Sequence, residues 1–182
     1  MSYFRGQTVF VTGATSGLGL EMSKQLVVGG ENVAEVSFDY LKRNKGQFML
    51  LAAVSGLIPN HSYSAYAASK FASVGLVEVL RYEWKPFCVD VKLACPPTVM
   101  TPMVEQELKE SPKESQVLKA FSGYLDIEFA CRYMLHGLSK RSFYIVPGFK
   151  IKAVLWLQRL FPSINRFIAD RVIGFYHKRS SR

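Results

Sequence analysis

The amino-acid sequence predicts an α/β domain in which helices cover both faces of a parallel sheet. Short apolar stretches rich in β-branched residues alternate with longer amphipathic stretches, and the first apolar stretch ends in a glycine-rich turn. The 182 residues suffice for one domain with its own core. Strands joined through helices run in the same direction, so the sheet is expected to be parallel.

Four elements are predicted in the first part of the chain. Residues 8–12 form a buried strand because they are mainly β-branched or aromatic and are followed by glycine. A helix is expected over about residues 17–28, where a glycine pair ends it. Residues 33–43 have an imperfect apolar face that predicts a second helix, closed by a basic segment and Gly46. Residues 47–54 form the second strand.

The clearest helix spans residues 64–84, where alanine, leucine and valine occupy related faces and Pro86 lies just beyond the end. Residues 89–94 are predicted as a third strand. Residues 96–122 are polar and charged, which indicates a mobile loop with one or two short helices. The remaining predicted elements before the tail are a helix at residues 127–138 and a strand at residues 143–146.

The composition separates residues 1–149, the predicted sheet domain, from a basic tail at residues 150–182. The tail holds eight basic residues and one acid, so it carries +7 of the net charge of +9. Pro162 divides its apolar residues into two predicted amphipathic helices. They can pack on the sheet or a partner subunit, or lie in a membrane interface; nucleic acid is disfavoured because bulky apolar residues separate the charges.

Other classes of protein are disfavoured by the composition. The three cysteines form no CxxC pair, which argues against a disulfide framework or zinc site and for a reducing compartment. The histidines are far apart, so no metal is expected. We see no secretory signal and no apolar run of about 20 residues, and therefore expect a cytoplasmic protein, or one peripheral to a membrane.

A glycine-rich turn follows the first strand and opens the next helix. Glycines at this place permit close approach of a diphosphate, and the helix N-terminus offers unpaired N–H groups. The alternative is a turn with only a structural role. The candidate cofactor residues are Gly13, Thr15, Ser16, Gly17, Leu18 and Gly19.

Tyr66 and Lys70 lie one turn apart on the predicted helix at residues 64–84, and therefore on the same face. A phenol exchanges protons poorly at neutral pH unless its anion is stabilised, and a nearby ammonium group does this. Such a tyrosine can protonate a carbonyl oxygen as hydride reaches the carbon. The alternative is an ordinary surface pair.

These motifs together resemble a known family. The stretches TGATSGLG (residues 12–19), YAASK (residues 66–70) and PPTVMT (residues 96–101) are similar to motifs of the short-chain dehydrogenase/reductase family, especially its 3-ketodihydrosphingosine reductase-like members. The resemblance implies a Rossmann-like fold and an NAD(P)(H)-dependent oxidoreductase, with NADP(H) favoured over NAD(H). The implied substrate is a lipid-like ketone or alcohol, and a homo-oligomer is compatible with the family.

The same resemblance implies roles for individual residues. Tyr66 is the implied acid–base residue, while Lys70 holds the ribose hydroxyls and tunes the tyrosine. The loop at residues 96–101 closes over the nicotinamide, which makes Val99 and Thr101 cofactor-binding residues.

Two departures from the family pattern predict impaired activity. Ala53 stands at the position of the catalytic serine, and loss of such a donor costs about a hundred- to a thousandfold in rate. Near Gly30 to Val33, roughly 75–80 residues of a complete domain are missing, equivalent to two to three βα units and the catalytic asparagine. The first strand must then pair with residues 47–54 or leave an open edge. A non-catalytic membrane-associated or partner-binding remnant is the alternative.

Overall fold

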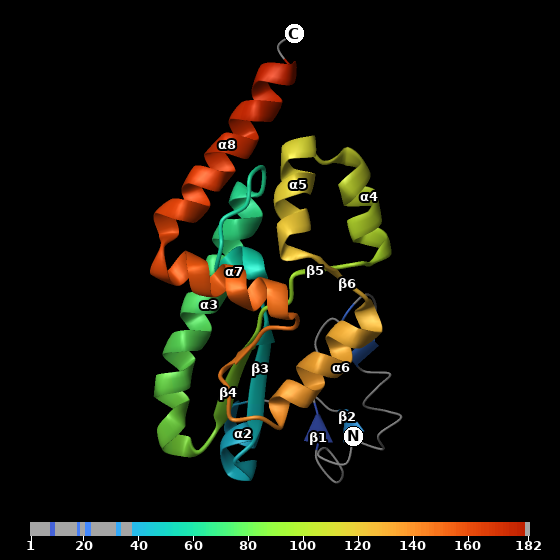
Figure 1. Cartoon of the computed structure of the whole chain (residues 1–182). Helices are drawn as coiled ribbons and strands as arrows, with labels where there is room; N and C mark the ends of the chain where they lie inside the picture. Colours follow the sequence, from blue (N-terminus) through green and yellow to red (C-terminus); the bar gives the residue numbers. More distant parts are fainter. Residues whose placement is uncertain (1–7, 10–17, 19–20, 23–31, 34–37, 181–182) are drawn as a thin grey trace. The chain divides into compact units, whose positions relative to one another are not determined.

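The computed structural model describes residues 8–9, 18, 21–22, 32–33 and 38–180 (Figure 1). The chain folds as two compact units. The first comprises Met1–Leu51, Gly75–Ala94 and Asp126–Ile145, and the second comprises Ala52–Val74, Cys95–Leu125 and Val146–Arg182. The chain passes between the units several times, and one long helix contributes residues to both.

A three-stranded parallel sheet lies in the first unit. Its central strand β4 (Asp90–Ala94) is buried along four of its five residues, because it has a neighbouring strand on each side. The predicted strands at residues 47–54, 89–94 and 143–146 are present, although all three are shorter than expected. The neighbours of β4 are β3 (Gln47–Leu51) and β7 (Tyr144–Ile145), and both pairings are parallel.

One face of this sheet is covered by the helix α3 (Ser64–Trp84). The register of the strands puts Phe48 and Tyr144 on the same face. The Phe48 ring lies 5.3 Å from the Trp84 ring, centroid to centroid, and the Tyr144 hydroxyl donates a hydrogen bond to the Glu78 carboxylate. Both partners belong to α3, so this helix packs on the face that Phe48 and Tyr144 share.

The helix α6 (Ile127–Leu138) covers the opposite face. Ile145 follows Tyr144 in β7 and so points to the other side of the sheet. There it lies so close to Gly137 of α6 that a Cβ on this glycine would stand 2.5 Å from the Ile145 Cγ2. Lys92, on the same face, is 1% exposed, and its ammonium group donates to the Lys140 carbonyl oxygen just beyond α6. The expected Rossmann-like arrangement, with helices on both faces, is confirmed.

The predictions for the beginning of the chain are partly wrong. Val33 is predicted to begin a helix, but it lies in the two-residue strand β2 (Asn32–Val33), and the helix α2 covers Phe38–Asn44. The strand β1 (Thr8–Val9) pairs in parallel with β2 and, among the described strands, belongs to a different sheet from β3. Among the described residues, β1 pairs with β2 and not with β3, so the expected pairing of the first strand with residues 47–54 is not found there.

The stretch at residues 96–122 contains two helices, as predicted. The strand β5 (Thr98–Val99) pairs with β6 (Tyr124–Leu125), and the helices lie between them. They are α4 (Pro102–Glu110) and α5 (Lys113–Ser122). The first begins at Thr101, whose Oγ1 accepts a hydrogen bond of 3.3 Å from the Val104 N–H.

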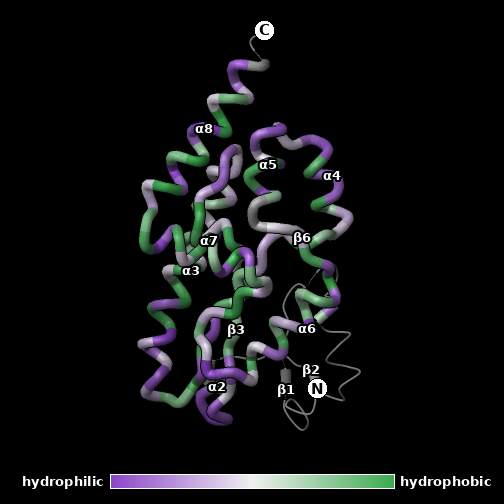
Figure 2. The backbone as a smooth tube through the Cα atoms, viewed as in Figure 1, coloured by the Kyte–Doolittle hydropathy of each residue, from purple (hydrophilic) through white to green (hydrophobic). Residues whose placement is uncertain are grey.

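The predicted pair of tail helices is also present. α7 (Phe149–Leu160) and α8 (Pro162–Ser180) contact each other, and both contact α5. Figure 2 shows hydrophilic and hydrophobic residues alternating along both helices. Exposed aromatic side chains on these helices include Phe149, Trp156, Phe167 and Phe175, and Phe161 is exposed at the bend between them. Among the helices that the structure describes, none has the length and apolar character needed to cross a membrane.

Candidate functional site

The candidate catalytic residues lie in the second unit, where the chain leaves β3 and turns back into α3. A single turn of 3₁₀ helix, η2 (Val54–Gly56), follows Ala53. It packs so closely on α3 that a Cβ on Gly56 would stand 2.6 Å from the Lys70 carbonyl oxygen. Only glycine fits this contact without displacing backbone, so the turn is fixed against the helical segment that carries Tyr66 and Lys70.

The loop at residues 96–101 is joined to the same turn. The Val54 N–H donates a hydrogen bond of 3.1 Å to the Pro96 carbonyl oxygen. Further along, Val99 is buried in β5, and the Met100 N–H donates to the Leu125 carbonyl oxygen at 2.9 Å. Within the second unit, the structure thus brings together the turn η2, the first half of α3 and the loop at residues 96–101 that the sequence connects with a cofactor.

Tyr66 and Lys70 lie within the first two turns of α3, as predicted. The Tyr66 side chain is 46% exposed, and the Lys70 Nζ is 5.4 Å from the centroid of its ring. Lys70 makes no ion pair with any side chain in the described part of the chain. The ammonium group and the phenol are therefore both available to a ligand.

Ala53 occupies extended backbone, with φ −162° and ψ 164°, immediately before η2. The side chain at this position ends in a methyl group and makes no capping hydrogen bond. The serine donor of the family pattern is absent at this point, and no other hydroxyl is bonded there in its place among the described contacts of the turn.

Cys95 is the other ionisable residue near Lys70. Burial raises the pKa of the Cys95 thiol to about 12, and the charge of Lys70 opposes this shift only in part. The thiol therefore stays protonated at neutral pH and is a packing residue rather than a nucleophile.

Most of the glycine-rich turn, including Gly13, Thr15, Ser16, Gly17 and Gly19, lies outside the described residues. Leu18 is described: it is helical and half-buried, and its carbonyl oxygen is 3.6 Å from the Cys131 Sγ. Helical structure at Leu18, and again at Glu21 and Met22, agrees with the predicted helix that follows the turn.

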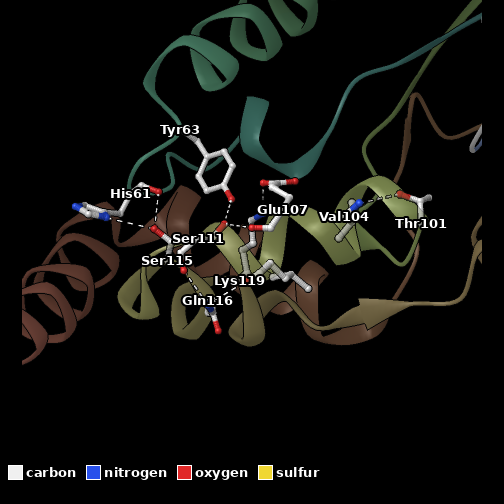
Figure 3. A network of polar contacts seen from close by, with 10 residues as sticks. His61, Tyr63, Thr101, Val104, Glu107, Ser111, Ser115, Gln116 and Lys119 are labelled. Carbon is white, nitrogen blue, oxygen red and sulfur yellow. Dashed lines mark hydrogen bonds and ion pairs between the residues drawn. The ribbon is translucent and has the colours of Figure 1, made fainter.

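A polar network beside Tyr66 was not anticipated from the sequence (Figure 3). The Lys119 Nζ of α5 lies 2.8 Å from the Glu107 Oε1 of α4 and 4.2 Å from the centroid of the Tyr63 ring. The Tyr63 and Ser111 hydroxyl oxygens are 3.0 Å apart. The Tyr63 ring stands edge-on to the Tyr66 ring, at a centroid distance of 6.3 Å. The Tyr63 ring thus lies next to the ion pair and next to Tyr66, the candidate acid–base residue.

A second group of bonds fixes the turn between α4 and α5. The Gln116 Nε2 donates to the carbonyl oxygens of Leu108 and Ser111 at 2.9 and 2.8 Å. Ser115 is fully buried, and its hydroxyl donates to the His61 carbonyl oxygen at 3.1 Å. The segment before α3 is therefore bonded directly to α5.

The pKa values in this network depart from their usual ranges. Partial burial raises the pKa of the Tyr66 phenol; Glu107 adds to this increase and Lys119 opposes it. Burial alone would raise the pKa of Glu107, but hydrogen bonds with Lys119 and Tyr63 outweigh burial and lower it. Burial alone would lower the pKa of Lys119, and its bonds with Glu107 and Tyr63 raise it instead.

Patterns in the sequence carry only a weak signal for this network. Glu107 and Lys119 are twelve residues apart and on different helices, so the i, i+4 spacing that suggests an ion pair on one helix is missing. Tyr63 lies one residue before α3 begins, where a helical pattern cannot place it. Among the described residues, no group of three or more His, Cys, Asp or Glu side chains is arranged to hold a metal ion.

Part of the chain matches a known protein family. Residues 32–112 match the family model described as short chain dehydrogenase. Over this segment the chain is similar to the short-chain dehydrogenase/reductase family. The matched segment contains the candidate site residues Ala53, Tyr66, Lys70, Val99 and Thr101.

Several curated relatives in this family are named as reductases of a sphingoid ketone. A 3-dehydrosphinganine reductase of Danio rerio is 38% identical over 82 residues, which are 45% of this chain and 25% of the relative. The 3-dehydrosphinganine reductase TSC10B of Arabidopsis thaliana is 28% identical over 127 residues, 68% of this chain and 38% of the relative. The chain thus matches well under half of the length of each.

Solved structures of short-chain dehydrogenases share the fold. One from Burkholderia cenocepacia J2315, in complex with NADP, has a TM-score of 0.74 at 14% identity, covering 89% of this chain and 96% of that one. Another from Burkholderia phymatum, in complex with NAD, has a TM-score of 0.64 at 17% identity, covering 91% and 97%. At these identities the likeness establishes the Rossmann-like fold.

The Glu107–Lys119 pair should stabilise the fold near neutral pH. Because Glu107 is 37% exposed and Lys119 is 12% exposed, solvent screens the pair, and Lys119→Met should cost about 1–2 kcal/mol at pH 7. The lowered pKa of Glu107 means that this contribution is present above its unfolded-state value and is lost as the pH falls through the folded-state value. The raised pKa of Lys119 means that it is lost again as the pH rises through the folded-state value of that residue.

Urea unfolding of the unaltered chain and of Lys119→Met, from acid to alkaline pH, measures this loss of unfolding free energy. The matched control is Arg132→Met, which removes the Arg132–Glu128 pair of α6, whose two side chains are largely exposed. Its effect should stay within about 0.5 kcal/mol. Equal losses for the two variants, or a loss for Lys119→Met that does not vary with pH, would contradict the structural role of the Glu107–Lys119 pair.

Proposed function

We propose that this chain derives from an NAD(P)(H)-dependent reductase of a lipid-like ketone, of the 3-ketosphinganine type, and that its activity is impaired. The observation that carries the proposal is the placement of Tyr66 and Lys70 on α3, with the turn at Gly56 fixed against this helix and the Pro96 carbonyl bonded to the same turn. The names of the curated relatives support the substrate class. These relatives are longer than this chain, which matches 25% and 38% of their lengths, and we propose their type of activity for it.

The described residues fit a nicotinamide cofactor in two respects. Lys70 has no ion pair within the described region, so its ammonium group is available to ribose hydroxyls. The Thr101 Oγ1 accepts the Val104 N–H, which leaves the hydroxyl hydrogen of Thr101 free to donate. Such a cofactor supplies hydride to the carbonyl carbon. The proposed binding residues are Gly13, Thr15, Ser16, Gly17, Leu18, Gly19, Tyr66, Lys70, Val99 and Thr101, and NADP(H) is favoured over NAD(H).

The proposed chemistry of the protein itself is a proton transfer. Tyr66 gives its phenolic proton to the developing alkoxide oxygen of the substrate, and Lys70 stabilises the phenolate that remains. Ala53 supplies no hydrogen bond to this oxygen, since its side chain is a methyl group. Part of the stabilisation of the alkoxide is therefore missing, which is the first reason for the proposed impairment.

The second reason is an internal truncation near Gly30 to Val33. β1 pairs with β2 at Asn32–Val33, and α2 follows within a few residues. In a complete doubly wound domain, the strands next to β1 carry the groups that hold the adenosine. Their loss should weaken cofactor binding even where the diphosphate turn is retained.

The alternative function is a non-catalytic protein that binds a membrane or a partner through residues 150–182. The specific observation in its favour is the exposure of large aromatic residues on α7 and α8, with Trp156 68% and Phe167 57% exposed, in the segment that holds most of the net charge. Aromatic rings between basic residues suit an anionic lipid surface. Peripheral membrane contact is compatible with either function, as is a homo-oligomer in the cytoplasm.

Isothermal titration with NADPH, followed by assay of a sphingoid ketone, tests the proposed enzyme. We expect weak binding and slow turnover that Tyr66→Phe abolishes, since phenylalanine keeps the ring and removes the proton donor. Tyr82→Phe is the matched control, because Tyr82 is an exposed tyrosine of the same helix. Absence of NADPH binding would refute the enzyme, and unaltered turnover in Tyr66→Phe would refute the role of Tyr66.

Ala53→Ser restores the hydroxyl of the family pattern. We expect the residual rate of ketone reduction to rise at least tenfold, within the range that one oxyanion donor contributes. Ala52→Ser, at the buried neighbouring position, is the control and should not raise the rate. An unchanged rate in Ala53→Ser would mean that the truncation, rather than the missing donor, limits activity.

Flotation with vesicles tests the membrane contact. Deleting α7 and α8 would uncover α5, which both helices contact, so point substitutions in the whole chain are preferable. Trp156→Ser combined with Phe167→Ser should reduce flotation with phosphatidylcholine vesicles that contain phosphatidylserine, and Tyr82→Ser should not. Equal flotation of the unaltered chain, the double variant and Tyr82→Ser would exclude a membrane role for Trp156 and Phe167.

A further inference from the structure

We propose that Glu107 and Lys119 are positioning residues for Tyr66, and that the charges of their ion pair control how firmly the Tyr66 hydroxyl holds its proton. This inference rests on the proposed function of Tyr66 as the acid–base residue. It extends that function by assigning a role to α4 and α5, which carry neither of the motif residues Tyr66 and Lys70.

The geometry connects the pair to Tyr66 in two steps. The Lys119 Nζ lies 2.8 Å from the Glu107 Oε1 and 4.2 Å from the centroid of the Tyr63 ring. The Tyr63 ring lies 6.3 Å from the Tyr66 ring at an interplanar angle of 71°. Figure 3 shows Glu107 and Lys119 converging below Tyr63 from the two helices. The ion pair thus lies beside Tyr63, whose ring is the neighbour of the Tyr66 ring.

The positions of these charges are fixed by other bonds. The Ser111 hydroxyl donates to the Glu107 carbonyl oxygen at 2.7 Å and lies beside the Tyr63 hydroxyl at 3.0 Å. Gln116 bonds two carbonyl oxygens at the turn between the helices. A charge pair held in one geometry acts on its neighbour consistently, whereas an exposed pair is averaged over many conformations.

Four titratable or charged groups face Tyr66 from the elements around it. They are Tyr63 before α3, Lys70 in α3, Glu107 in α4 and Lys119 in α5. Partial burial is the largest cause of the raised Tyr66 pKa, Glu107 and Tyr63 add to it, and Lys119 lowers it. Glu107 acts on Tyr66 more strongly than Lys119 does, so the net effect of the pair is to keep the phenol protonated.

The protonation state of Tyr66 determines which direction of the reaction it can assist. Ketone reduction needs a tyrosine that carries its proton, whereas alcohol oxidation needs the phenolate. A phenol that stays protonated at neutral pH is in the form that ketone reduction needs. Removing the negative charge of Glu107 should lower the pKa of the Tyr66 phenol, because the opposing charge of Lys119 would remain, and so increase the share of the phenolate that alcohol oxidation needs.

Fluorine NMR of the whole chain, with fluorotyrosine in place of Tyr66, measures this effect directly. The fluorine lowers the intrinsic pKa of the phenol, so that the titration is complete before alkaline pH affects the fold. We expect Glu107→Gln to lower the titration midpoint by on the order of half to one pH unit and Lys119→Met to raise it. Glu110→Gln, an exposed carboxylate of the same helix α4, should leave the midpoint unchanged.

The double variant Glu107→Lys with Lys119→Glu separates the electrostatic role from a structural one. It restores an ion pair between α4 and α5, so the fold is retained, but it places the cation at the position that acts more strongly on Tyr66. The proposal predicts a midpoint below that of the unaltered chain. A purely structural pair predicts an unchanged midpoint in this variant, and that result would overturn the proposal.

The titration also separates this inference from the proposed function, because it requires no turnover. Shifts of the titration midpoint in the predicted directions support the assignment of Glu107 and Lys119 even in a chain that fails to bind NADPH. In that case the proposed enzymatic function is refuted and the assignment stands. Unchanged midpoints in a chain that binds NADPH and reduces a ketone would overturn the assignment alone.

Discussion

The burial of β4 on both faces is the constraint on which the rest of this structure depends. Leu93 and Ala94 have no exposed surface, and the strand is paired on both edges. A strand in this position satisfies its backbone in the sheet and needs apolar cover above and below. The helices α3 and α6 provide this cover. The half of α3 that packs on the sheet continues along the chain into the half that carries Tyr66 and Lys70.

Much of this arrangement is encoded locally and could be predicted. α3 spans Ser64–Trp84 as expected, because its apolar periodicity is regular and Pro86 prevents its continuation. Tyr66 and Lys70 could be assigned for the same reason, since helical spacing places them on one face. β2 could not be predicted, because a two-residue strand carries no periodic signal and depends on a partner more than twenty residues away.

The network around Glu107 shows a different limit of sequence reasoning. The charged stretch at residues 96–122 correctly indicated helices, but the pairing of Glu107 with Lys119 depends on how α4 and α5 fold back on each other. That fold depends on Gln116 and on the bond from Ser115 to the His61 carbonyl oxygen, neither of which has a characteristic spacing. A site formed by contacts between helices is visible only once the tertiary structure is known.

The three cysteines differ in a way that makes the protein convenient to label. Burial raises the pKa of Cys95 and of Cys131 to about 12, whereas Cys88 is exposed at the end of the short helix η3 (Lys85–Phe87). Alkylating reagents attack the thiolate, so a maleimide probe should modify Cys88 selectively in the folded chain. Attachment at this position gives a single fluorescent or spin label without any change to the sequence.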